Sequence, residues 1–147
     1  AMNGGNLGFS GDLAGLSTEL QSAMIPYVEF QKQYRDSIAR CAGYNLTPRE
    51  TAERLATWMA FQYHDMQDDR HFVYAFHLVR FGDGIRRFRL HEIYPEKKYF
   101  LRKVFPAASA AEEIVDGAIL QHAGLRIDFR FDPQGGWRGM LFVLEPC

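Results

Sequence analysis

The chain lacks the features that would cross-link it or place it in a membrane. It has two cysteines, Cys41 and Cys147, too few for a disulfide framework, so we expect free thiols in a reducing compartment. No apolar run reaches the ~18–20 residues that a membrane helix needs. The first residues also show no basic segment followed by an apolar run, as a signal peptide would. These absences predict a cytoplasmic protein that does not contact a membrane.

Recognised catalytic and cofactor motifs are also missing. The sequence has no P-loop, no G-x-S-x-G nucleophile turn and no H-E-x-x-H zinc motif. Its element order echoes acetyltransferases of the GNAT type, but VFPAASAAEE stands where their pyrophosphate-binding turn is expected. The sequence therefore predicts no catalytic residue and no cofactor, and a small enzyme with an unrecognised site is kept as a third alternative.

The length and composition predict one globular domain. The chain has 147 residues, of which 47% are hydrophobic and 24% are charged, values typical of a folded domain with its own core. Residues 1–11 are rich in Gly and Asn and are expected to form a loose arm, with Ala1 a remnant of tag removal. The domain is expected to cover residues 12–147.

Helices are predicted from apolar periodicity and from two capping boxes. A stripe at residues 27–41 has helical spacing, and Pro26 is expected to interrupt or open that helix. Thr47–Glu50 matches a capping box and predicts a second helix that runs to residue 66. Trp58 and Phe61 lie off the main apolar stripe of this predicted helix. The second capping box, Ser109–Glu112, predicts a helix over residues 109–122.

Strands are predicted in the remaining apolar stretches. Residues 72–81 are apolar on both parities, which indicates a strand covered on both faces. Residues 85–94, 125–132 and 137–145 also read as strands, and residues 98–105 read as a strand or a short helix. The fold class is therefore predicted to be α+β: an antiparallel sheet of about four to five strands with helices packed on one face, in the order α-α-βββ-α-ββ.

This element order is similar to that of class I type III secretion chaperones and of some toxin-immunity proteins. No sequence motif accompanies the similarity, which rests on the order of elements alone. It implies a small protein that binds another protein and performs no catalysis.

One histidine-rich segment, HDMQDDRH at residues 64–71, is a candidate metal site. If the second helix runs to its end, His64, Asp68 and His71 share one face and could hold a divalent ion. Against this, carboxylates at a helix C-terminus oppose the helix dipole. The alternative is a solvated helix end without a metal.

Charge is unevenly distributed along the chain. Residues 80–103 have a net charge of +5 and the remainder has −6. Arg87, Arg89 and His91 share a strand parity and would form a row that suits phosphates or an acidic protein surface. Tyr94, Tyr99 and Phe100 could stack nucleic-acid bases. The alternative is a set of cations that merely solvates an exposed sheet face.

The favoured interpretation is a non-catalytic protein that binds a partner with an acidic surface, such as an adaptor, inhibitor, immunity-type protein or chaperone. The second is nucleic-acid or anionic-ligand binding through residues 86–103. A homodimer through the second helix is a further alternative. The residues expected to bind the partner are Arg86, Arg87, Arg89, His91, Lys97, Lys98, Arg102, Lys103, Trp58 and Phe61.

Overall fold

The chain divides into two compact units, residues 1–41 and residues 42–147. The computed structural model describes residues 14–47, 57–77, 84–105, 111–130 and 138–147. The predicted N-terminal arm lies outside these described residues.

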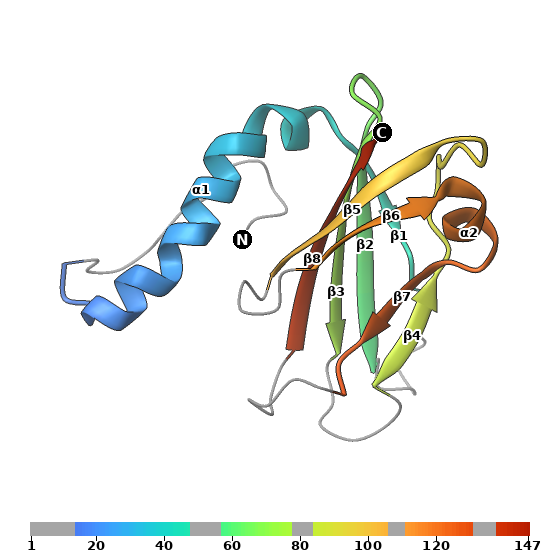
Figure 1. Ribbon diagram of the computed structural model, residues 1–147. Helices are drawn as coiled ribbons and strands as arrows, with labels where there is room; N and C mark the ends of the chain where they lie inside the picture. Colours follow the sequence, from blue (N-terminus) through green and yellow to red (C-terminus); the bar gives the residue numbers. More distant parts are fainter. Residues whose placement is uncertain (1–13, 48–56, 78–83, 106–110, 131–137) are drawn as a thin grey trace. The chain divides into compact units, whose positions relative to one another are not determined.

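The first unit contains one long helix, α1 (Thr18–Arg40) (Figure 1). The hydroxyl of Ser17 caps it by accepting a hydrogen bond from the Leu20 amide at 3.3 Å. Pro26 lies inside the helix, so the prediction that it interrupts or opens a helix is wrong. Proline has a helical φ, and the helix continues through it although the ring removes one backbone hydrogen bond and crowds the carbonyl four residues earlier.

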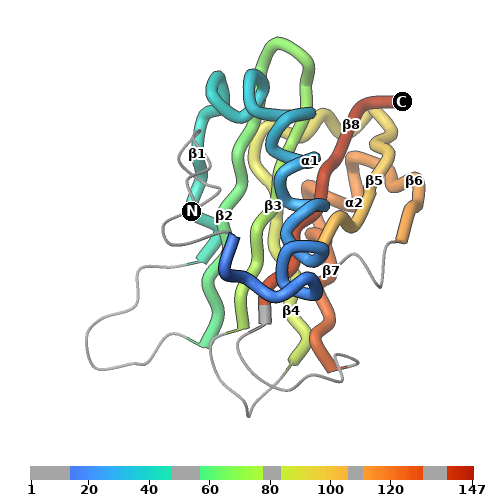
Figure 2. The backbone as a smooth tube through the Cα atoms, turned by 90° about the vertical axis from the view of Figure 1, so that its left-hand side faces the viewer, coloured from blue at the N-terminus to red at the C-terminus, as the bar shows by residue number. Residues whose placement is uncertain are grey.

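The second unit contains two antiparallel sheets (Figures 1 and 2). In the six-stranded sheet the order is β1-β2-β3-β8-β5-β6, and the two-stranded sheet pairs β4 with β7. The strands are β1 (Ala42–Asn45), β2 (Trp58–Asp65), β3 (Arg70–His77), β4 (Ile85–Phe88), β5 (Lys98–Phe105), β6 (Glu112–Asp116), β7 (Leu125–Asp128) and β8 (Arg138–Pro146). A short helix, α2 (Gly117–His122), lies between β6 and β7.

The hydrophobic core of the second unit lies between the two sheets. The core residues come from β2, β3, β5 and β8 of the large sheet, from β4 and β7 of the small one, and from Leu120 of α2. Val73 and Ala75 of β3 belong to this core, while Phe72 and Tyr74 on the opposite parity are buried as well. The prediction of a doubly covered central strand is therefore confirmed for residues 72–75, whereas Phe76 is half-buried. Residues 78–81 lie outside the described residues.

The helix predicted from Thr47 to residue 66 is wrong over its described part, because Trp58–Asp65 forms β2. The sequence WMAFQYHD also alternates: Trp58, Ala60, Gln62 and His64 are all buried on one parity. Eight residues of β2 pair in register with eight of β3. This long ladder outweighs the local capping signal at Thr47.

The helix predicted over residues 109–122 is also wrong in part. Glu112–Asp116 forms strand β6 on β5, and only Gly117–His122 is helical. Gly124 follows this helix in a left-handed conformation at φ +82°, which glycine often adopts at a helix end. Ser109 lies outside the described residues.

The fold class must be corrected accordingly. The antiparallel pairing of the strands is as predicted. The α+β assignment and the order α-α-βββ-α-ββ are wrong, because two predicted helices are replaced by strands in a mainly β unit. Residues 98–105 form strand β5 rather than a helix. The similarity to secretion chaperones and immunity proteins, which rested on element order, loses its basis.

Candidate functional site

The histidine-rich segment forms the β2–β3 hairpin rather than a helix end. β2 ends at Asp65 and β3 begins at Arg70. Within the turn Asp69 has a positive φ of 50°, which Asp tolerates better than most residues. His64 and His71 are cross-strand partners, with ring centroids 4.2 Å apart and an interplanar angle of 8°.

The carboxylate that joins the two histidines is Asp69, whereas the sequence pattern pointed to Asp68. Oδ1 of Asp69 lies 3.3 Å from Nε2 of His64 and 3.4 Å from Nε2 of His71. Asp68 instead lies 3.6 Å from Arg70 on the more exposed side of the turn. The helical spacing that selected Asp68 does not apply to a hairpin, which places Asp69 next to both rings.

The second oxygen of Asp69 binds side chains that come from far along the chain. Oδ2 accepts hydrogen bonds from Nζ of Lys97 at 2.8 Å and from the Tyr99 hydroxyl at 3.2 Å. That hydroxyl in turn accepts a hydrogen bond from the backbone amide of Tyr94 at 3.2 Å. Burial alone would raise the pKa of Asp69, but the Lys97 hydrogen bond and the neighbouring charges outweigh it, so this pKa lies below its usual value.

Gln62 closes the cluster on the other side of His71. Its Oε1 accepts from the His91 amide at 2.8 Å, and its Nε2 donates to the His91 carbonyl at 2.7 Å. These two backbone bonds fix which end of the side-chain amide is the donor. The same Nε2 lies 3.0 Å from Nδ1 of His71, so Nδ1 must be the acceptor and carries no proton.

Burial shifts the pKa of two further groups in the cluster. Burial and the neighbouring His64 lower the pKa of His71 to about 4, although Asp69 opposes the shift. His71 is therefore neutral at pH 7, with its single ring proton on Nε2. Burial also raises the pKa of the Tyr99 hydroxyl to about 12, so it stays a hydrogen-bond donor.

These groups fit a metal ion poorly, although His64, Asp69 and His71 place one potential ligand atom each within 4.8 Å of one another. The imidazole lone pairs lie in the ring planes, and nearly parallel stacked rings do not converge on one point. A neutral histidine that binds a metal through Nε2 carries its proton on Nδ1, which normally donates to an acceptor. Here Nδ1 of His71 faces the amide donor of Gln62. The cluster is better described as a hydrogen-bond network, in which Nδ1 of His64 and Nε2 of His71 are buried without a hydrogen-bond partner among the described residues.

The basic side chains predicted to bind a partner are spread over several environments. β4 ends at Phe88, so Arg87, Arg89 and His91 do not form the predicted row on one strand. Tyr99 is fully buried and cannot stack a base. Arg86 lies over the ring of Phe88, Arg87 donates to the Gly124 carbonyl, and His91 stacks on Tyr44. Lys97 and Lys98 form ion pairs with Asp69 and Asp116. Arg102 lies opposite Glu112 in the pairing of β5 with β6. Lys103 lines a small cleft beside β5, and Arg89 is exposed.

Trp58 and Phe61 lie on β2. Trp58 is only 4% exposed and packs against His77, Phe88 and Phe129 in the core. It is therefore not available at the surface of this unit, and the predicted contact through Trp58 must be corrected. Phe61 is half-buried. The role of Phe61 and of the basic side chains in binding a partner stays a prediction.

Sequence reasoning missed Gln62, Asp69 and Tyr99 as members of the cluster. One signal was available: two histidines flank a short segment and become cross-strand neighbours if that segment is a turn. No local signal links Asp69 to Lys97 or Tyr99, which lie 28 and 30 residues away.

Comparison with known proteins identifies the fold. No family model matches the chain, and no curated protein matches it. The α-galactosidase from Lactobacillus brevis has a similar structure, with a TM-score of 0.74, 16% identity, 92% of this chain covered and 18% of that chain. The GH36 α-galactosidase from Geobacillus stearothermophilus has a TM-score of 0.71 and 16% identity. The match covers 92% of this chain and 17% of that chain. The galactosidase domain of an α-galactosidase–sucrose kinase has a TM-score of 0.69 and 17% identity. The match covers 91% of this chain and 17% of that chain.

At these identities the likeness shows the fold alone. The chain shares the fold of a portion of GH36 α-galactosidases and spans about one sixth of their length. Within the part of the chain that the structure describes, no helix is both long and apolar enough to cross a membrane.

Proposed function

We propose that this chain is a non-catalytic part of an α-galactosidase-like assembly and that it acts by binding the catalytic remainder. The supporting observation is the coverage of the structural likeness. About 92% of this chain superposes on only 17–18% of each α-galactosidase chain. Nearly all of this fold therefore has a counterpart in those enzymes, whereas most of each enzyme has no counterpart here.

The polar cluster supports a non-catalytic role. Glycoside hydrolysis normally requires two carboxyl groups, one to protonate the leaving oxygen and one to act as nucleophile or base. The His64–Asp69–His71 group contains one carboxylate. That carboxylate already accepts hydrogen bonds from Lys97 and Tyr99, so it is committed to holding the fold together.

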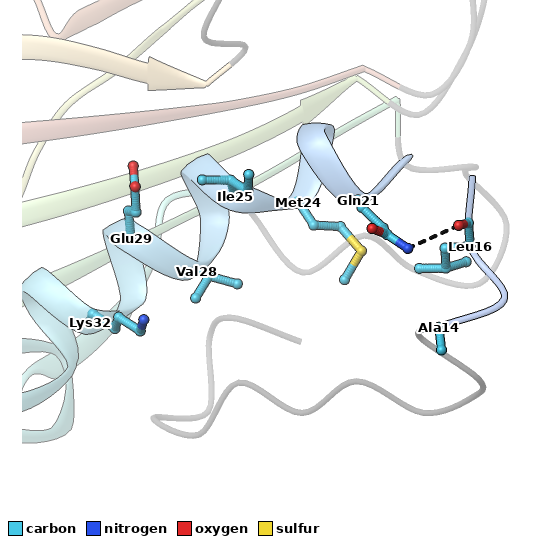
Figure 3. A pocket seen from close by; sticks show the side chains of 8 residues that line it. All are labelled: Ala14, Leu16, Gln21, Met24, Ile25, Val28, Glu29 and Lys32. Atoms are coloured by element: carbon cyan, nitrogen blue, oxygen red, sulfur yellow. Dashed lines mark hydrogen bonds between the residues drawn. The ribbon is translucent and has the colours of Figure 1, made fainter. Parts of the chain in front are cut away.

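A surface for the catalytic remainder is available on α1. Leu20 and Ile25 are 54% and 53% exposed, and Tyr27 is 40% exposed. A shallow groove of about 570 Å³ lies along the same helix, with Met24 and Val28 among its lining side chains (Figure 3). Exposed apolar side chains gathered along one helix are typical of a surface that another protein covers.

An activity-based capture experiment tests the proposal. The purified chain should not hydrolyse p-nitrophenyl α-D-galactopyranoside, while the tagged chain should retain α-galactosidase activity from an extract of its source cells. Ile25→Glu should abolish that capture, because a charge cannot be buried in an apolar contact. Arg35→Gln, at an exposed position of the same helix, serves as the control and should capture normally. Hydrolysis by the chain alone would contradict the proposal, as would capture without enzyme activity or undiminished capture by Ile25→Glu.

A further inference from the structure

The segment 91–97, which leads into β5, is tied to the β2–β3 hairpin at two points and to β5 itself at a third. The ties join Gln62 to the backbone of His91, Tyr99 to the amide of Tyr94, and Asp69 to the ammonium of Lys97. All three meet in the buried cluster around His71, because Gln62 contacts His71 directly and Asp69 lies beside its ring. The conformation of this exposed segment is therefore set by a buried histidine.

The hydrogen bonds of the cluster have a single allowed direction. Both amide hydrogens of Gln62 are used, one on the His91 carbonyl and one on Nδ1 of His71. Flipping the amide would place its oxygen against the His91 carbonyl and its NH₂ against the His91 amide, which loses both bonds. Gln62 therefore requires an unprotonated Nδ1 on His71.

We propose that Gln62 and His71 form a proton-sensitive latch, which holds segment 91–97 on the hairpin and releases it when Nδ1 of His71 is protonated. A protonated Nδ1 is a donor, so it would face the NH₂ of Gln62 donor against donor. Gln62 must then rotate or withdraw, and it loses its bonds to His91. This inference does not depend on the proposed role in an α-galactosidase-like assembly.

The charged groups around His71 favour release in acid and retention at neutral pH. His64 faces the ring from β2, and Lys97 lies on the tied segment itself; a positive charge on either opposes protonation of His71. The negative charge of Asp69, in the turn, favours protonation of His71, while the Tyr99 hydroxyl from β5 stays neutral. Below its own pKa, Asp69 also loses its charge and with it the ion pair to Lys97. Both titrations therefore weaken the ties in the same direction.

Amide hydrogen exchange of the full ¹⁵N-labelled chain tests the latch. The His91 amide, whose acceptor is Gln62, should lose about tenfold or more of its protection between pH 6 and pH 4 after correction for intrinsic exchange. Amides of Val143 and Leu144 in β8 should remain protected, which distinguishes local release from unfolding. Equal protection of His91 at both pH values would overturn the proposal.

Three variants separate the latch from a general loss of packing. His71→Gln retains an oxygen that can accept the Gln62 hydrogen bond but cannot titrate, so protection of His91 should become independent of pH. Gln62→Met should lose that protection at every pH. Gln121→Met is the matched control, because Gln121 binds the Ile93 carbonyl of the same segment at 3.5 Å; it should keep the wild-type pH dependence. Persistence of that dependence in His71→Gln would overturn the latch.

The tautomer of His71 provides a test that needs no variant. Long-range ¹H–¹⁵N spectra of the wild-type chain at pH 7 should show the ring proton on Nε2 and a bare Nδ1. A proton on Nδ1 would contradict the inferred direction of the hydrogen bonds. A zinc-induced shift of this tautomer would show a metal site instead and would equally overturn the latch.

Discussion

The rings of His64 and His71 stack across the β2–β3 hairpin, and the carboxylate of Asp69 lies beside Nε2 of both. The turn that separates the two strands supplies this carboxylate. One hairpin therefore provides both histidines and a carboxylate that accepts a hydrogen bond from Nε2 of His64, while Lys97 and Tyr99 of the β5 region bind the second oxygen of that carboxylate. The side chain of Asp69 therefore links β2, β3 and the β5 region.

Replacing Asp69 by Asn should destabilise the second unit. The variant keeps a side chain of the same size that tolerates the positive φ. It removes the negative charge that pairs with Lys97 and that accepts a hydrogen bond from Nε2 of His64. We expect a loss of about 1–3 kcal/mol in the free energy of unfolding at pH 7. Urea denaturation followed by circular dichroism measures it. Asp68→Asn, one residue away on the more exposed side of the turn, should change stability by no more than about 0.5 kcal/mol.

Stability of the second unit should fall in mild acid because of His71. The pKa of this group is about 4 in the folded chain, against 6.5 for an unperturbed histidine. Between these two values the unfolded chain binds a proton that the folded chain does not, so the free energy of unfolding decreases as pH falls. The full decrease from this one group is about 3 kcal/mol by pH 4.

Urea titrations at pH 7, 5.5 and 4.5 check this prediction. His71→Gln should flatten the pH dependence over this range, because it removes the group that titrates differently in the two states. His122→Gln, at an exposed position on α2, should leave the dependence unchanged. A wild-type stability that stays constant from pH 7 to pH 4.5 would contradict the assignment.

Strands with apolar residues on both parities were predictable from sequence, whereas strands that carry helical signals were not. β3 was identified because a run with apolar side chains at successive positions fits a strand covered on both faces. β2 and β6 follow or overlap capping boxes, which are local signals of helix initiation. Both segments become strands through pairing with β3 and β5. Such pairing depends on residues distant in sequence and is invisible to local patterns.

The candidate site shows the same limit at the level of single residues. His64 and His71 were named together as candidate metal ligands on one helix face, and helical spacing chose Asp68 as their companion. Once the segment is a hairpin, the turn places Asp69 beside both rings. Gln62 could not be chosen from sequence either, because its role depends on the backbone of His91, 29 residues away.

Trp58→Ala should be among the most destabilising substitutions in the second unit. The indole is 4% exposed and packs against Phe88 of β4 and Phe129, which follows β7, so it joins the two sheets. We expect a loss of about 3–5 kcal/mol, the usual range for removing a buried aromatic side chain. Thermal unfolding monitored by far-ultraviolet circular dichroism measures it. Met59→Ala is the neighbouring control, since Met59 is 38% exposed on the opposite parity, and it should cost less than about 1 kcal/mol.

Gly117→Ala should disrupt the junction between β6 and α2. A Cβ at this position would lie 2.1 Å from the carbonyl oxygen of Tyr94 and 3.0 Å from that of Lys97, and neither is a flexible side chain. The Gly117 amide also donates to the Lys97 carbonyl at 2.8 Å, so the backbone cannot withdraw without losing this bond. We expect a loss of about 2–4 kcal/mol and a displaced segment 91–97. Gly43→Ala provides the contrast, because its Cβ would meet only the ring of Tyr63 at 3.3 Å. Equal stability of the two variants would show that the Tyr94 backbone yields, and the close approach at Gly117 would then not constrain the fold.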